Sequence, residues 1–243
     1  MIHNTREFTF DMPATISRAR RVLIKPYVDF TNPARSTSMA MLDKIISAIR
    51  QISDTDVVLL GSTPDGTPIH PVYENLGYNF PRVISIDVKD CVLVEVDNPL
   101  PKPFILPTFW LPNVILSSDY LFSVTPLHYT EGLLTSSIMN LLSLLPVSKY
   151  SNGSGEGLGA LYDQGIDKVL ADLYFTLPFD MSIIESNYPM MLPENFSQFV
   201  SPAYGKIIIG DPFEADMNVC DYLGIKTEYL DLIQLAKAEM EED

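Results

Sequence analysis

Short apolar runs alternate with an amphipathic stretch in the first hundred residues. Val22 to Val28 has the length and composition of a buried strand, and Ser38 to Ile52 places apolar side chains at the spacing of a helix. Asp56 to Ser62 and Val83 to Val88 are two further strand patterns, separated by the turn sequence Thr-Pro-Asp-Gly-Thr-Pro. This alternation predicts an α/β fold with a mostly parallel, mixed sheet flanked by helices.

The second half of the chain repeats the alternation less regularly. Five prolines between Asn98 and Pro112 exclude a regular helix and favour an extended, hinge or covering segment. The strongly apolar stretch from Leu133 to Leu145, closed by Pro146, predicts a central helix. Helices are also expected over residues 166–177, 217–223 and 228–242, and strands over 181–185 and 206–210. The chain is expected to form one α/β domain, with the alternative of two lobes, 1–112 and 113–243, and a cleft between them.

Charge and cysteine content exclude several classes of function. The 16 basic and 31 acidic residues give a net charge of −15, which opposes binding to nucleic acid or to an anionic membrane surface. The two cysteines, Cys91 and Cys220, indicate neither a disulfide framework nor a cysteine-ligated zinc or iron-sulfur site. No apolar stretch has the length of a signal peptide or a membrane span. We therefore expect a soluble, cytoplasmic protein.

Five sequence blocks occur in the order in which they occur in one family. They are VLIKPYV, SSDYLFSVTPLHYT, SSIMNLLSLLP, GIDKVLADL and GDPFEADMNVCDYLGI. Together they resemble the domain-of-unknown-function family 362 (DUF362) over about residues 20–238. The resemblance implies an α/β fold and a largely unassigned biochemical role. The ferredoxin module that members of the family often carry is not expected here.

Several positions that are cationic in the family hold other residues in this chain. Where relatives carry proline-lysine-leucine-lysine-threonine-histidine, residues 125–130 read TPLHYT, and the lysine expected before Asn140 is Met139. The family's methionine-glutamate-glycine element has no counterpart at residues 186–189. If these lysines bind an anionic ligand in relatives, each lost charge-assisted hydrogen bond costs about 1.5–3 kcal/mol. The resemblance therefore implies altered or lost activity.

Five polar residues remain as candidates for binding a ligand. Lys25 ends a buried strand, where open α/β sheets bind ligands, although a snorkelling or ion-paired lysine gives the same pattern. His128, with an unperturbed pKa of about 6.5, fits a general base, a metal ligand or a structural histidine. Asn140 keeps the asparagine of the family block. Asp211 and Asp216 lie at the start of a predicted helix, and we expect Asp211 to cap it while Asp216 faces the cleft.

Other patterns support weaker predictions. The alternating glycines of residues 153–159 lack the strand and helix context of a phosphate-binding loop, so a flexible linker is favoured over an anion nest. No nucleophile-elbow motif supports a Ser-His-Asp triad. Carboxylates such as Asp172 and Glu185 are abundant in so acidic a chain, so no metal site is predicted. No motif identifies a cofactor.

Two functions from different classes stay open. In the first, the chain is a non-catalytic or altered-specificity relative that binds a small molecule or a protein partner. In the second, it is an enzyme acting on a small substrate in a cleft near Lys25, His128, Asn140 and Asp211. Convergence of these side chains on one pocket, with a shifted pKa for His128, would favour the enzyme. A homodimer is a third interpretation, with residues 109–111 (Phe-Trp-Leu) and the proline segment as its contact patch.

Overall fold

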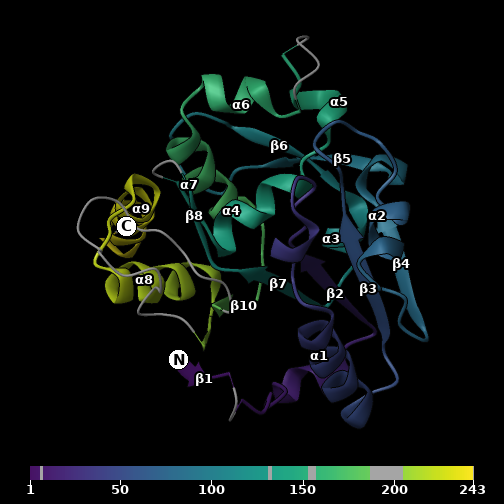
Figure 1. Cartoon of the computed structure of the whole chain (residues 1–243). Coiled ribbons are helices and arrows are strands. Elements are labelled where there is room, and N and C mark those ends of the chain that lie inside the picture. Colours follow the sequence, from purple (N-terminus) through teal and green to yellow (C-terminus); the bar gives the residue numbers. More distant parts are fainter. Residues whose placement is uncertain (6–7, 131–132, 153–156, 187–204, 243) are drawn as a thin grey trace.

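The computed structural model describes residues 1–5, 8–130, 133–152, 157–186 and 205–242. Seven strands form one sheet in the order β1-β11-β10-β7-β2-β3-β4 (Figure 1). They are β1 (Ile2–Asn4), β2 (Arg21–Pro26), β3 (Asp56–Gly61), β4 (Val83–Asp87), β7 (Tyr120–Pro126), β10 (Met181–Ser186) and β11 (Lys206–Gly210). The five strands from β10 to β4 are parallel, β11 runs antiparallel to β10, and β1 runs antiparallel to β11. The predicted class, α/β with a mostly parallel mixed sheet, is confirmed.

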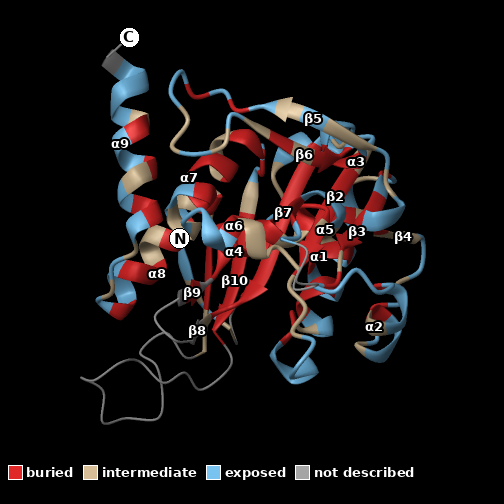
Figure 2. Cartoon of the chain, turned by 90° about the horizontal axis from the view of Figure 1, so that it is seen from above, coloured by how far each residue is buried: buried red, intermediate tan, exposed pale blue. Residues whose placement is uncertain are grey.

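Helices cover both faces of the sheet because buried strand residues alternate between two hydrophobic clusters. Val22 and Ile24 of β2 pack with the first group of helices, and Leu23 packs with the second. The first group is α1 (Met39–Ile52), α2 (His70–Asn75) and the 3-10 turn η1 (Ala14–Arg18). The second is α3 (Asn113–Leu116), α4 (Ser137–Leu141), η4 (Leu142–Leu144), α5 (Val147–Tyr150), α6 (Gly159–Asp163), α7 (Ile166–Thr176), α8 (Pro212–Leu223) and α9 (Glu228–Glu242). Figure 2 shows the buried strands between these layers and the exposed outer side of α9.

The proline segment forms a hairpin arm and a loop that cover the second cluster. Strand β6 (Thr108–Pro112) pairs antiparallel with β5 (Leu93–Asp97), which η3 (Val88–Asp90) joins to β4, and the side chains of Phe109 and Leu111 are fully buried. The Asp172 carboxylate of α7 accepts hydrogen bonds from Asn98 Nδ2 and from the backbone N–H groups of residues 104–106, at 2.8–2.9 Å. Trp110 is partly exposed, with the Lys149 ammonium 3.8 Å from its ring centroid. Of residues 109–111, which were expected in a dimer patch, Phe109 and Leu111 thus belong to the hydrophobic core of the chain itself.

Strands from the two halves of the chain are neighbours in the sheet. β2 pairs with β7 from Val22 opposite Tyr120 to Pro26 opposite Val124. Residues 1–112 and 113–243 therefore share one hydrogen-bonded sheet.

The predicted helix from Leu133 to Leu145 is wrong at its start. Residues 133–135 form strand β9, which pairs with β8 (His128–Thr130), and α4 begins only at Ser137. The reason is tertiary: the buried Asp216 carboxylate accepts hydrogen bonds from the backbone N–H groups of Ser137 and Ile138, which fixes the first turn there. A continuous apolar run cannot by itself separate a buried strand from a buried helix.

Three further observations concern membrane-spanning helices, cysteines and metal ligands. Within the described ranges, no helix combines the length and apolar character needed to cross a membrane. Both cysteines carry free thiols. Among the same residues, no group of three or more His, Cys, Asp or Glu side chains is arranged to hold a metal ion.

Candidate functional site

A pocket of about 570 Å³ lies at the carboxyl edge of the parallel strands. Its walls come from the segments that directly follow β2 and β3, from His128 after β7, and from α4 and η4. The sheet order explains this position. The chain passes from β2 outward to β3 and β4 and then returns to β7 on the other side of β2, so the winding direction reverses between β2 and β7. Open α/β sheets bind ligands in the crevice outside the strand ends at such a switch point.

Lys25 lies on β2 at this point and is almost fully buried, with 2% of its surface exposed. Because side chains alternate along a strand, it shares the face of Leu23, on which α4 packs. Its ammonium nitrogen Nζ lies 2.6 Å from the backbone oxygen of Pro26 and 3.1 Å from Asn140 Oδ1. Burial lowers the pKa of Lys25 to about 7. A large fraction of this amine is therefore neutral at physiological pH.

Asn140 joins α4 to two strands. Its side-chain nitrogen Nδ2 donates to the backbone oxygen of Lys25 at 3.2 Å and to Ser123 Oγ of β7 at 3.1 Å, while its Oδ1 accepts from Lys25 Nζ. The residue is buried, so these bonds replace the water that its amide loses. Asn140 thus fixes the amine of Lys25 against the pocket wall.

His128 stands where the chain leaves β7 and enters β8. Its Nε2 lies 2.8 Å from the backbone oxygen of Arg35, which only accepts, so Nε2 carries the proton and the neutral ring has Nδ1 as its acceptor. The ring packs against Tyr27 with centroids 5.7 Å apart. Burial lowers the pKa of His128 below its usual value, and this effect outweighs the hydrogen bond to the Arg35 backbone oxygen, which raises the pKa. The neutral form of the imidazole is therefore favoured.

Sequence reasoning missed three residues of this pocket: Tyr27, Asp29 and Arg35. All three follow the carboxyl end of β2 within ten positions, which is the signal that could have found them. Hydrogen bonds hold their segment in place, since Tyr27 N donates to Thr37 Oγ1 and to the backbone oxygen of Val124. The loop that carries Arg35 is therefore attached to β7.

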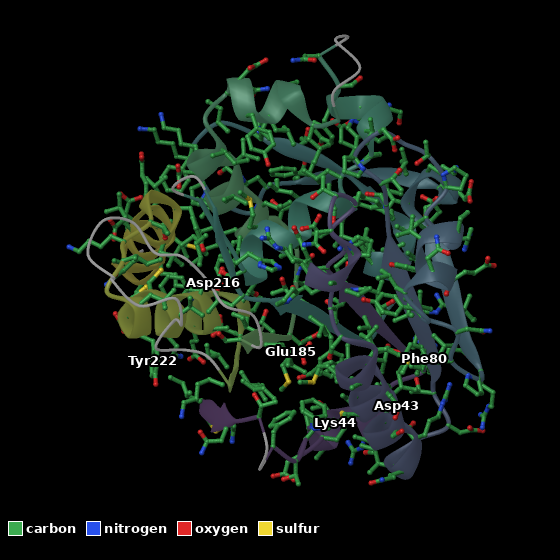
Figure 3. The ribbon with its side chains drawn as sticks, in the orientation of Figure 1. Asp43, Lys44, Phe80, Glu185, Asp216 and Tyr222 are labelled. Carbon is green, nitrogen blue, oxygen red and sulfur yellow. The ribbon has the colours of Figure 1, made fainter. Side chains whose placement is uncertain are left out.

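The two aspartates lie elsewhere and have structural contacts. Asp211 is the N-cap of α8, as expected, because its Oδ1 accepts from the backbone N–H groups of Phe213 and Glu214 at 2.9 and 3.2 Å. Asp216 is fully buried on the inward side of α8 (Figure 3). Ser136 Oγ and the Tyr229 hydroxyl also donate to its carboxylate. Burial raises its pKa to about 6, against the opposing effect of these hydrogen bonds. Neither aspartate lines the pocket.

The structure thus brings together three of the five candidates, Lys25, His128 and Asn140. Asp211, the fourth residue expected near an enzyme's substrate, is not among them. Two other expectations concern segments outside the described residues, namely part of the glycine segment (153–156) and the missing family element at 187–189. Glu185 lies near the end of β10 (Figure 3). Its carboxylate accepts hydrogen bonds from the backbone N–H and the hydroxyl of Ser38, the N-cap of α1, and so holds that helix to the sheet.

These features define the class as an open-sheet α/β protein with a pocket at the switch point, within the roughly 300–1,000 Å³ typical of small-molecule sites. No protein-family model matches the chain, and no curated protein sequence matches it. Among solved structures it is similar to the lactate racemase apoprotein from Thermoanaerobacterium thermosaccharolyticum, with a TM-score of 0.55 and 13% sequence identity. The match covers 86% of this chain and 50% of the racemase, so the chain spans about half the length of that protein. At this identity the similarity establishes the fold alone.

Proposed function

We propose that the protein binds a small organic anion in the pocket at the end of β2. The observation that carries the proposal is the exposed guanidinium of Arg35 in the pocket lining, beside the amine of Lys25, in a chain of net charge −15. The lining holds one acidic residue, Asp29. Asp29 is already engaged, because its Oδ1 accepts three hydrogen bonds from Thr31 and Asn32. Burial opposes its ionisation, but these bonds outweigh burial and hold its pKa below the usual value. Because its own loop holds the Asp29 carboxylate, the Arg35 guanidinium can pair with an anionic ligand.

A carboxylate suits this lining. The planar guanidinium of Arg35 can donate two parallel hydrogen bonds to a carboxylate, and Arg35 is exposed, so it can reach a bound molecule. The racemase with the similar fold is named for lactate, a small hydroxy acid, which agrees with the expected size and charge. We also propose that the chain is a DUF362 relative of altered specificity. In this chain Arg35 supplies a cation in place of the missing family lysines.

Isothermal titration with lactate, pyruvate and malate tests the proposal, with glycerol as an uncharged control ligand. Arg35→Ala should weaken binding of the acids roughly ten- to hundredfold, since a hydrogen bond to a charged group is worth about 1.5–3 kcal/mol. Arg18→Ala is the matched control, because it removes the same charge from an exposed position on η1. Equal effects of the two variants, or no saturable binding of any acid, would reject the proposal.

An enzyme is the second candidate. Two residues of the pocket, Lys25 and His128, favour this function. Burial lowers the pKa of each, so the neutral forms of both side chains are favoured. Such groups are the usual donors and acceptors of protons in catalysis. Proton NMR of each bound acid in D2O over time provides the test. An enzyme is supported if the wild-type protein exchanges a proton of the acid for deuterium or converts the acid, and if Lys25→Met and His128→Asn abolish this reaction while they still bind the acid. Unchanged ligand spectra favour a binding protein.

A further inference from the structure

The amine of Lys25 has the hydrogen-bond environment of a neutral primary amine. A neutral amine has two N–H bonds and one lone pair, whereas an ammonium has three donors and no lone pair. Lys25 Nζ has two acceptors, the backbone oxygen of Pro26 at 2.6 Å and Asn140 Oδ1 at 3.1 Å. Lys25, Pro26 and Asn140 all line the pocket. The two N–H bonds are therefore accounted for by groups of the pocket wall, which leaves the lone pair for a bound molecule.

No acidic partner holds a proton on this amine. The ion pairs found in the described part of the chain join Arg20 to Asp119, Arg82 to Asp54 and Lys89 to Asp87, and all lie elsewhere. Burial without a counter-ion explains why the pKa of Lys25 falls to about 7. With a pKa near 7, a substantial share of this amine is neutral at pH 7, against roughly one part in 2,500 for an ordinary lysine. Desolvated lysines of this kind are the ones that attack carbonyl compounds.

We propose that Lys25 forms an imine with the carbonyl carbon of a small 2-oxo acid or aldehyde held in the pocket. The proposal rests on the proposed function, since the carbonyl compound has to bind in the same place. In the first step the Nζ lone pair attacks the carbonyl carbon, a C–N bond forms, and a proton moves from nitrogen to the former carbonyl oxygen to give a carbinolamine. In the second step that hydroxyl group takes a proton from solvent and leaves as water, and the nitrogen lone pair forms the C=N double bond of the protonated imine. No oxidant or reductant takes part.

The wall around Nζ suits the product as well as the free amine. The protonated imine keeps a single N–H bond, which can remain on either the Pro26 oxygen or Asn140 Oδ1. Imine formation thus costs one hydrogen bond and does not leave a charged group without a partner. A 2-oxo acid has, in addition, a carboxylate for Arg35, which lines the same pocket.

Reductive trapping of the intact protein tests the inference. The full chain is incubated at pH 7 with pyruvate and cyanoborohydride, which reduces a protonated imine to a stable secondary amine, and is then digested and mapped by mass spectrometry. We expect the reduced adduct on the peptide that contains Lys25, at about tenfold or more above any other lysine, because the other lysines are mostly protonated. Lactate, which has the same carboxylate but no carbonyl, should give no adduct. The mapping uses wild-type protein, so it does not depend on a variant that folds.

Variants and titration then separate the two proposals. Lys25→Arg should abolish the main adduct, while Lys44→Arg, an exposed lysine of α1, should retain it. An adduct spread evenly over surface lysines would overturn the imine. Saturable binding of both lactate and pyruvate without an adduct at Lys25 would also overturn it and leave the anion-binding pocket standing. If neither acid binds and no adduct forms, both proposals fail.

Discussion

Asn140 and Lys25 hydrogen-bond to each other in both directions although 115 residues separate them in the chain. Asn140 Oδ1 accepts from Lys25 Nζ at 3.1 Å, and Asn140 Nδ2 donates to the backbone oxygen of Lys25 at 3.2 Å. This reciprocal pair joins α4 to the end of β2 at the point where the winding of the sheet reverses. The same contact therefore stabilises the fold and orients the amine on which the proposed chemistry depends.

Replacing Asn140 by Ala should lower the free energy of unfolding by about 2–4 kcal/mol, because buried polar groups of β2 and β7 lose their partner. The expected loss is measured by urea denaturation. Asn218→Ala on α8 is the control, since its half-buried side chain donates, within the described part of the chain, to the Glu214 backbone oxygen of its own helix. This change should alter stability by less than about 0.5 kcal/mol. Equal effects at the two positions would mean that the reciprocal pair is not formed in solution.

Lys25 should make the stability depend on pH between about 7 and 10. In this window the unfolded chain holds a proton on the amine that the folded chain has released, so the free energy of unfolding rises with pH by up to about 1.4 kcal/mol per unit. Below pH 7 both states hold the proton and the dependence vanishes. Urea titrations of wild type and Lys25→Met at several pH values isolate this effect as the difference between the two curves. A constant difference from pH 7 to 9 would show that the pKa of Lys25 is not lowered.

Gly61, the last residue of β3 and part of the pocket wall, has no room for a methyl group. A Cβ at this position would overlap the hydroxyl of Tyr73, which is buried and has no hydrogen-bond partner among the described residues. Gly61→Ala should cost about 1–3 kcal/mol. Tyr73→Phe removes the clashing, unsatisfied hydroxyl and should be neutral or stabilising.

The double variant decides between a clash and a backbone effect. Gly61→Ala combined with Tyr73→Phe should recover a coupling energy of about 0.5–3 kcal/mol relative to the sum of the single variants. Thermal unfolding of the four proteins provides the cycle. Strict additivity would show that the Tyr73 hydroxyl does not limit the space at Gly61.

Asp216 should be essential for stability and unnecessary for ligand binding. Asp216→Ala removes the acceptor of four buried hydrogen bonds, two of them from the first N–H groups of α4, and should cost about 3–5 kcal/mol. Tyr229→Phe removes only one of the four and should cost about 1–2 kcal/mol while leaving the affinity for a small acid unchanged. Weaker ligand binding in Tyr229→Phe, without a loss of stability, would indicate instead that this cluster is part of a ligand site.

Much of the fold could be predicted because it depends on local patterns. The apolar spacing of residues 38–52 and the Ser38 cap lead to α1, and the Gly-Asp-Pro turn leads to the Asp211 cap of α8. The predicted helix at 217–223 nevertheless starts earlier, at Pro212, because the Asp211 cap fixes the first turn directly after it. The start of α4 could not be predicted at all, because it depends on a carboxylate some eighty residues further along the chain.

The candidate site was predicted only in part. Lys25 was found because a strand end in a parallel sheet is a frequent ligand position, and His128 and Asn140 were found through the resemblance and their chemistry. Arg35 was missed because its contribution depends on how the loop after β2 folds back toward β7, where its backbone oxygen meets His128. Asp216 was expected to face the cleft, whereas in the structure its buried carboxylate accepts hydrogen bonds from residues of α4 and α9.

The sequence by itself determined most of the strands and helices, such as β2, β3 and α1, and which of their faces are apolar, since periodicity along one element reports how that element is buried. Only the tertiary structure decided that β2 lies between β3 and β7, and therefore that Lys25 meets Asn140 and loses its contact with water. The physical reason is that desolvation and hydrogen bonding depend on neighbours in space. A solvent-exposed lysine at the end of a strand has an ordinary pKa, and the packing of α4 against β2 removes Lys25 from solvent.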